Sequence, residues 1–169
     1  MPGPKSPMTE SRRTAGNKLA RAIATWFGCG YAPVAPGTAG SLAALVIAVA
    51  LHELAGLTGW HFLVLAAAIF APAIWAATDT ARAVKIKDPG IVVVDEVIGQ
   101  WIAIAGAPSL NWKSYVGAFA LFRLFDIWKP PPVRQLEDLP EGLGIVADDA
   151  MAGAYAALVL FLAGWFNWY

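Results

Sequence analysis

Charged residues are scarce in this chain of 169 residues: they make up 14% of it, whereas hydrophobic residues make up 58%. A soluble domain has about 25% charged residues, so the composition excludes an ordinary small water-soluble globule. The 12 basic and 12 acidic residues cancel, which excludes a nucleic-acid partner bound through bulk positive charge. The single cysteine, Cys29, excludes a disulfide framework and a structural zinc site built on cysteines. We therefore expect an all-α fold, a polytopic membrane bundle of helices.

The N-terminal region divides into a tail and a short helix. Residues 1–17 are polar, are punctuated by Pro and Gly and contain no long apolar stretch, so we expect a disordered tail and no cleavable signal peptide. Residues 18–169 are expected to form a single membrane-embedded domain. At its start, residues 18–27 favour an interfacial helix on an anionic leaflet, and the alternative is an ordinary amphipathic surface helix. The expected apolar face consists of Leu19, Ala22, Ile23, Trp26 and Phe27.

Long apolar runs mark the candidate membrane helices. Residues 28–41 are rich in Gly and Pro and predict a loop, because such a run does not continue a helix. An apolar run over 42–57 follows, and a longer one covers 60–78. A spanning helix needs about 20 residues, so the first run is short and the second is adequate. The last run, 150–168, is also long enough to span.

The apolar run over 97–122 determines the topology. Pro108, Ser109 and Asn111 interrupt it, and these residue types favour a turn. We therefore predict a hairpin that turns at 107–111, instead of one long helix. Its first arm is too short to span a membrane by itself, so we expect this arm to be re-entrant, tilted or screened by neighbouring helices.

The hairpin has a consequence for the polar segments. It places 79–96 and 128–149 on the same side of the membrane, whereas one long helix would place them on opposite sides. Basic residues occur at 82–87 and 129–134, and the short connection between the first two apolar runs has none. By the positive-inside rule we expect these polar loops to face the cytoplasm, in the inner (cytoplasmic) membrane of the cell.

The acidic residues gather at the expected ends of apolar helices. The adjacent pairs Asp95-Glu96 and Asp148-Asp149 repel each other and are costly to desolvate beside apolar helices. A hard divalent cation would relieve this repulsion, and oxygen ligands without clustered Cys or His favour Mg²⁺ or Mn²⁺ over Zn²⁺. The alternative is that such pairs only cap helices. The acids expected on this side are Asp79, Asp95, Glu96, Asp126, Asp148 and Asp149.

Candidate phosphate-binding groups occur in two places. The Gly-rich segment 36–41 leads into a helix, whose first N–H groups can bind an anion; the alternative is a flexible loop with Ser41 as an ordinary N-cap. Arg123 and Asp126, at i and i+3, share one helical face, and Lys129 follows them. For these three residues the alternative is a local ion pair beside a lysine that only snorkels to the membrane surface.

Four segments, in this order, resemble the phosphatidylglycerophosphatase A family. They are 28–41 (GCGYAPVAPGTAGS), 87–101 (KDPGIVVVDEVIGQW), 121–130 (LFRLFDIWKP) and 142–153 (GLGIVADDAMAG). The resemblance implies an all-helical, Mg²⁺-dependent membrane phosphatase whose substrate is an anionic phospholipid. Such an enzyme removes the terminal phosphate of phosphatidylglycerophosphate and gives phosphatidylglycerol and inorganic phosphate. Glu141 departs from the pattern, because we expect another glycine there.

Resemblance and chemistry together imply the roles of the site residues. The expected Mg²⁺ ligands are Asp95, Glu96, Asp148 and Asp149. The expected catalytic residues are Asp79, Asp95, Glu96 and Asp149, one of which acts as general base. The expected substrate-binding residues are Gly37, Thr38, Ser41, Arg123, Asp126 and Lys129, with Asp126 orienting the arginine. Whether water or an aspartate attacks the phosphorus stays open at this point.

Two alternative functions stay open. One is a small membrane transporter or assembly protein with a cation site between helices, and the other is a phosphatase for another lipid phosphate. Acids in the middle of a span favour an ion pathway, whereas acids at span ends favour chemistry at the membrane surface.

Overall fold

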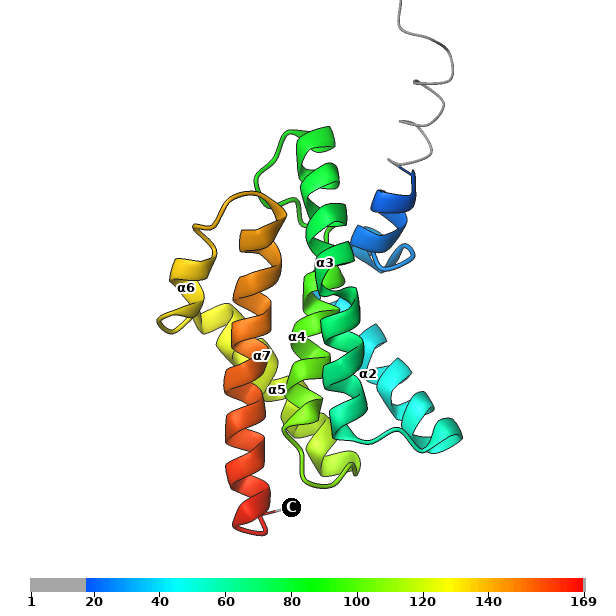
Figure 1. The fold of residues 1–169 in the computed structure, drawn as a ribbon, viewed down its shortest axis with the longest axis vertical. Helices are drawn as coiled ribbons and strands as arrows, with labels where there is room; N and C mark the ends of the chain where they lie inside the picture. The colour runs from blue at the N-terminus through cyan, green and yellow to red at the C-terminus, as the bar shows by residue number, and fades with distance from the viewer. Residues whose placement is uncertain (1–17, 169) are drawn as a thin grey trace, which may run out of the picture.

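The computed structural model describes residues 18–168 (Figure 1). All regular elements in this range are helical, which confirms the all-α prediction. The expected tail over 1–17 lies outside the described residues, and so does Tyr169. In chain order the elements are a helix over residues 18–24, the 3₁₀ helix η1 (Cys29–Tyr31), α2 (Pro36–Ala55), α3 (Gly59–Val84), α4 (Val94–Ala105), α5 (Trp112–Trp128), α6 (Val133–Leu136) and α7 (Gly142–Trp165).

Three helices, α2, α3 and α7, are long and apolar enough to cross a membrane. The prediction of a short first helix over 42–57 is wrong, because α2 begins at Pro36 and has 20 residues. A proline is well suited to the first turn of a helix, where its missing N–H would have no partner. Position 40 of α2 requires a glycine, because a Cβ there would lie only 2.8 Å from the Val93 Cβ and would clash with it. The Gly-rich segment is thus part of a closely packed helix.

The predicted hairpin is confirmed, with α4 and α5 as its arms. The chain turns between them, and Asn111 caps α5 by accepting the N–H groups of Lys113 and Ser114 on its Oδ1, at 2.9 and 3.1 Å. As a result, the starts of α2, α4 and α7 and the ends of α3 and α5 all lie at one end of the bundle, the upper end in Figure 1. We call this end the site end.

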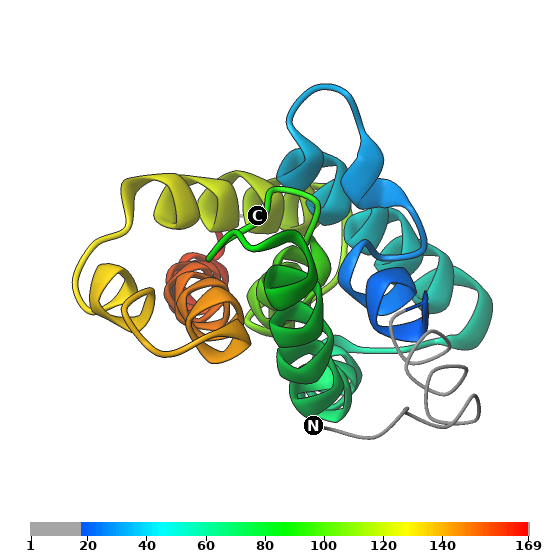
Figure 2. The same ribbon diagram turned by 90° about the horizontal axis from the view of Figure 1, so that it is seen from above.

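Helix α4 lies at the centre of the bundle and contacts α2, α3, α5 and α7. Figure 2, the view from the site end, shows α3 in front of this centre, with α7 on one side and α2 on the other. Ten of the twelve residues of α4 are buried, so neighbouring helices screen this short arm. Screening was one of the three expected alternatives. Gly99 and Gly153 form the crossing of α4 and α7: a Cβ on Gly153 would lie 2.4 Å from the Gly99 carbonyl oxygen.

The N-terminal helix is shorter than predicted and packs through a different face. It covers residues 18–24 and ends before Trp26 and Phe27, whose φ angles of 45° and 53° are left-handed. The fully buried residues are Ala20 and Ala24, whereas Phe27 of the expected apolar face is 79% exposed. Small side chains bring the helix close to the bundle, where the Ala24 carbonyl accepts the Val93 N–H at 2.8 Å. Its placement at the membrane interface stays a prediction.

Candidate active site

Charged side chains from α4, α5, α7 and the loop before α4 line one pocket of about 210 Å³ at the site end. The six carboxylates and two cationic groups are those of Asp88, Asp95, Glu96, Asp126, Asp148 and Asp149 and of Arg123 and Lys129. Negative charge therefore dominates the pocket. The structure brings together all the sequence-predicted acids except Asp79.

The acid pair of α7 lies inside the helix and not at its start. Helix α7 begins at Gly142, whose N–H donates to Thr78 Oγ1 at 3.0 Å, so the prediction of a helix beginning at 150 is wrong. Asp148 and Asp149 are consequently buried in the second turn, which excludes a capping role for them. Among residues 18–168, Asp148 Oδ1 and Asp149 Oδ2 are buried and have no hydrogen-bond partner. Buried carboxylate oxygens of this kind are normally satisfied by a water, an ion or another ligand.

The acid pair of α4 lies in the first turn of that helix, as expected. Both side chains are nearly buried, at 8% exposure each. The Glu96 N–H donates to Asp95 Oδ1 at 3.0 Å, so a favourable helix-terminus interaction contributes to holding this pair. Asp95 lies one turn before Gly99, and Asp149 lies one turn before Gly153. The close crossing of the two glycines therefore brings the two acid pairs into the same pocket.

Glu96 is fixed by three neighbours from two other helices. Ser41 Oγ donates to Glu96 Oε2 at 2.8 Å, and Arg123 donates to the same oxygen. Arg123 also pairs with Asp126 at 2.9 Å, which confirms that these two residues share a helical face. Gly37 presses on the other side of the carboxylate, because a Cβ there would lie 2.0 Å from Glu96 Oε1. The predicted N-cap alternative for Ser41 is wrong, since this residue is fully buried in the second turn of α2.

Lys129 turns into the pocket instead of snorkelling to the membrane surface. Its Nζ donates to Asp148 Oδ2 at 2.7 Å and lies 3.4 Å from Glu137 Oε2. Burial by itself would lower the pKa of Lys129, but the hydrogen bond and charge of Asp148, with the charge of Glu137, raise it above its ordinary value. The ammonium therefore stays charged and can hold an anion.

Asp88 is a pocket acid that sequence reasoning missed. It belongs to the segment 87–101, but it stands in a loop of mixed charge, where single acids are usually solvated. Asp88 is exposed overall, yet partial burial at the pocket rim raises the pKa of its carboxyl; Lys129 opposes this shift, and Glu137 and Asp126 reinforce it. The signal that could have identified it is the Pro89-Gly90 turn that leads straight into the acid-bearing helix.

Three sequence-predicted residues do not line the pocket: Asp79, Thr38 and Ser41. Asp79 lies half-buried on α3, which contributes no lining residue. Thr38 lies in the first turn of α2 beside Gly37, which does line the pocket, and Ser41 lies behind Glu96. The structure thus gives Ser41 a positioning contact with an acid instead of a direct path to a substrate.

Comparison with known proteins now adds to this geometry. The sequence model of phosphatidylglycerophosphatase A matches residues 22–164. The chain belongs to the phosphatidylglycerophosphatase A family. Proteins named phosphatidylglycerophosphatase A are 41% identical over 140 residues in Haemophilus influenzae (82% of this chain, 85% of that protein) and 33% identical over 144 residues in Escherichia coli (84% and 81%). No solved structure matches the chain.

A further relative in Bacteroides thetaiotaomicron is provisionally named a phosphatidylinositol-3-phosphatase. It is 42% identical over 147 residues, which cover 85% of this chain and 92% of that protein. The names of the relatives therefore point to two lipid substrates that share one chemical feature, a phosphomonoester on the headgroup.

The residues of this pocket can be compared with the ligands that a metal ion requires. Its donors are carboxylate oxygens, which suit Mg²⁺, and the two unpartnered oxygens of Asp148 and Asp149 are open to a ligand. Within residues 18–168, no three Asp, Glu, His or Cys side chains are arranged so as to hold a metal ion together. Glu96 and Asp148 are instead turned toward Arg123 and Lys129. The residue types fit the ion, and binding it would require these two carboxylates to exchange a cationic partner for the metal.

Proposed function

We propose that this chain hydrolyses the terminal phosphomonoester of phosphatidylglycerophosphate, releasing phosphatidylglycerol and inorganic phosphate. Family membership supports the reaction. The observation that carries the proposal is the pocket itself, in which buried acids from α4 and α7 face two cationic side chains at one end of apolar, membrane-spanning helices. A transporter or assembly protein has no need for that combination of anion-binding and proton-accepting groups.

The phosphoryl group has three kinds of donor available. Arg123 and Lys129 supply charged N–H donors on one side of the pocket. On the other side α2 begins, with Pro36 and Gly37 in the pocket lining and with no side-chain cap on its first N–H groups. A helix start of this kind is favourable for an anion. Gly37 is required there for a second reason, since any side chain would displace Glu96.

We assign Mg²⁺ as the cofactor, held by Asp95, Glu96, Asp148 and Asp149. The unpartnered oxygens of the α7 pair and the excess of acids in the pocket support this assignment. When bound, Mg²⁺ supplies neutralisation of phosphoryl oxygens and polarisation of an attacking water. With Glu96 and Asp148 holding the ion, Arg123 and Lys129 would be free of these carboxylates and available to the phosphate.

Asp149 is our candidate for the general base. Its Oδ2 is buried and has no hydrogen-bond partner within residues 18–168, and a carboxylate has two oxygens, so one of them can bind the metal while the other accepts a proton from the water that attacks the phosphorus. The bond to the glycerol oxygen then breaks, and that oxygen takes up a proton as phosphatidylglycerol leaves. Asp126 keeps Arg123 directed at the phosphoryl oxygens through its contact of 2.9 Å.

We also propose that the site end faces the cytoplasm in the inner membrane. Basic residues are concentrated in the loops at that end, which supports this orientation. Single cysteines at Lys85 and Glu137 should react with an impermeant thiol reagent only in inverted vesicles, whereas a cysteine at Ser109 should react in right-side-out cells. Labelling of Ser109 and Lys85 from one side would contradict the arrangement.

The function is tested with purified protein and a panel of lipid phosphates. We expect phosphate release from phosphatidylglycerophosphate, loss of release in EDTA and recovery with Mg²⁺. Asp149→Asn should reduce turnover by at least about 100-fold, because it removes a ligand charge and a proton acceptor. The matched control is Asp138→Asn, an exposed acid outside the pocket. Preferential hydrolysis of phosphatidylinositol 3-phosphate would assign the substrate of the Bacteroides relative instead, and EDTA-resistant activity would remove the metal.

A further inference from the structure

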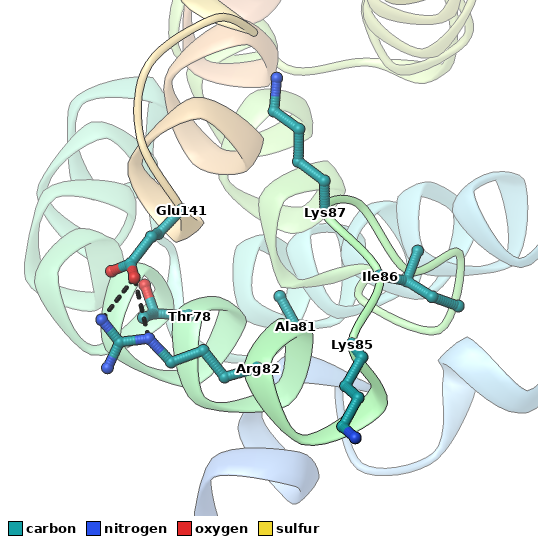
Figure 3. A pocket seen from close by; sticks show the side chains of 7 residues that line it. All are labelled: Thr78, Ala81, Arg82, Lys85, Ile86, Lys87 and Glu141. Carbon is teal, nitrogen blue, oxygen red and sulfur yellow. Dashed lines mark hydrogen bonds and ion pairs between the residues drawn. The ribbon is translucent and has the colours of Figure 1, made fainter.

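A second pocket, of about 260 Å³, lies at the site end but shares no lining residue with the catalytic pocket. Its lining comes from the end of α3, the loop that follows it and the residue before α7. Figure 3 shows Ala81 in the middle of this lining, with Arg82 on one side reaching to Glu141. The proposed hydrolysis uses none of these residues.

The charge of this second pocket is opposite to that of the catalytic one. Three of its lining side chains are cationic, Arg82, Lys85 and Lys87, and Glu141 is its single acid. Arg82 Nε donates to Glu141 Oε1 at 2.8 Å, which fixes the guanidinium. Within residues 18–168 neither lysine forms an ion pair, and both are exposed, extending to different sides of the pocket in Figure 3. Two exposed ammonium groups are therefore available for an anion.

The pocket lies where a lipid headgroup would be. Thr78 lines it and is the last residue of the run 60–78, which contains no Asp, Glu, Lys or Arg. The pocket therefore begins where α3 leaves the hydrocarbon. Ile86, between the two lysines, is 56% exposed and offers an apolar surface beside the charges. Apolar surface next to cationic groups at this level matches the ester region and phosphate of a phospholipid.

Glu141 has an unusual backbone conformation at the edge of this pocket. It has φ 57° and ψ −141°, a backbone conformation that suits glycine far better than a residue with a side chain. The glycine expected there would avoid the strain but would leave Arg82 without its partner. The strained glutamate, which directly precedes the first residue of α7, holds the arginine in the pocket lining.

We propose that this pocket binds the phosphodiester headgroup of an anionic phospholipid other than the substrate. The ammonium groups of Lys85 and Lys87 pair with the phosphate, and Ile86 and Ala81 contact the glycerol ester region. The site connects to the catalytic pocket through the chain, because Lys87 precedes Asp88 and Glu141 precedes α7. A bound headgroup thus holds two segments that lead to catalytic acids.

The test measures binding and does not depend on hydrolysis. Purified full-length protein is titrated by native mass spectrometry with phosphatidylserine, which is anionic but has no phosphomonoester, and with phosphatidylcholine as the neutral reference. We expect one molecule of phosphatidylserine to bind more tightly than phosphatidylcholine. Each juxtamembrane cation contributes about fivefold to such binding, so Lys85→Gln with Lys87→Gln should weaken it about 25-fold. The matched double variant, Lys18→Gln with Arg21→Gln, removes two exposed charges that line neither this pocket nor the catalytic one and should change it less than twofold.

Four outcomes would overturn the proposal. Equal losses in the two double variants would show diffuse attraction to a basic surface, and no loss in either would show that the lysines do not bind the lipid. A loss caused by Lys129→Met would place the phosphatidylserine in the catalytic pocket. Equally tight binding of glycerophosphoserine, which has no acyl chains, would show a site for a soluble phosphodiester instead of a lipid. None of these results bears on phosphatase activity, which is measured separately.

Discussion

Replacement of Gly153 by alanine tests whether the close crossing of α4 and α7 assembles the catalytic pocket. The added Cβ would lie 2.4 Å from the carbonyl oxygen of Gly99 and 2.9 Å from its Cα. Contacts of Cβ atoms below 3.0 Å are essentially absent from real structures, and the atoms approached here are backbone atoms that cannot rotate away. The two helices must therefore move apart at the level just below Asp95 and Asp149.

The size of the effect follows from a comparison with Gly117→Ala. Both substitutions raise helix propensity by up to about 1 kcal/mol, so this contribution cancels between them. At Gly117 the added Cβ would meet only the Leu160 Cδ2, at 3.1 Å, and a side-chain end can shift. Overpacking against backbone costs about 1–3 kcal/mol, which for a chain of this size corresponds to a difference in Tm of roughly 2–12 °C.

The assay compares thermal unfolding and phosphate release for the two variants in the same detergent. We expect Gly153→Ala to unfold at the lower temperature and to lose activity about 10- to 100-fold, since a displacement near 1 Å is enough to disturb catalytic geometry. Gly117→Ala should keep wild-type activity and unfold at or slightly above the wild-type temperature. If the two variants have equal Tm and equal activity, the glycine crossing does not position the acids, and the reasoning fails.

Three further predictions concern single pocket residues. Gly37→Ala should reduce kcat at least about tenfold with little change in Tm, because the Cβ displaces the Glu96 carboxylate; unchanged kcat would contradict the packing. Lys129→Met should lower kcat/KM by about 30- to 1000-fold if its ammonium holds the phosphoryl group, and a value within threefold of wild type at saturating Mg²⁺ would leave Arg123 as the single basic ligand. Asp88→Asn should lower kcat/KM by no more than about fivefold, because an exposed charge contributes little, and a larger loss would move Asp88 into the metal-binding set.

Local signals in the sequence predicted the topology correctly. The turn-forming residues Pro108, Ser109 and Asn111 lie in the connection between α4 and α5, and the asparagine caps α5 in the way that its residue type favours. The i and i+3 spacing of Arg123 and Asp126 predicted their contact. In each case the information lies within a few residues of the feature, so no knowledge of distant segments is needed.

Helix boundaries next to the site could not be predicted in the same way. Gly37 and Gly40 indicate a loop when read locally, but they lie in α2 because Glu96 and Val93 approach that helix too closely for a side chain. The early start of α7 has the same origin, because Gly142 packs against α3. These glycines are needed for contacts with segments more than 50 residues away. Composition and periodicity give no information about such distant contacts.

The early start of α7 also fixes how deep the catalytic acids lie. Gly142 is hydrogen-bonded to Thr78, and Asp149 follows seven residues later. At 1.5 Å per residue, Asp149 lies about 10 Å further along α7 than the start of that helix. A substrate phosphate that contacts Asp149 must therefore extend well past the level of Gly142. A terminal phosphate on a flexible glycerol arm can extend that far, whereas a phosphate attached directly to diacylglycerol has no arm with which to do so.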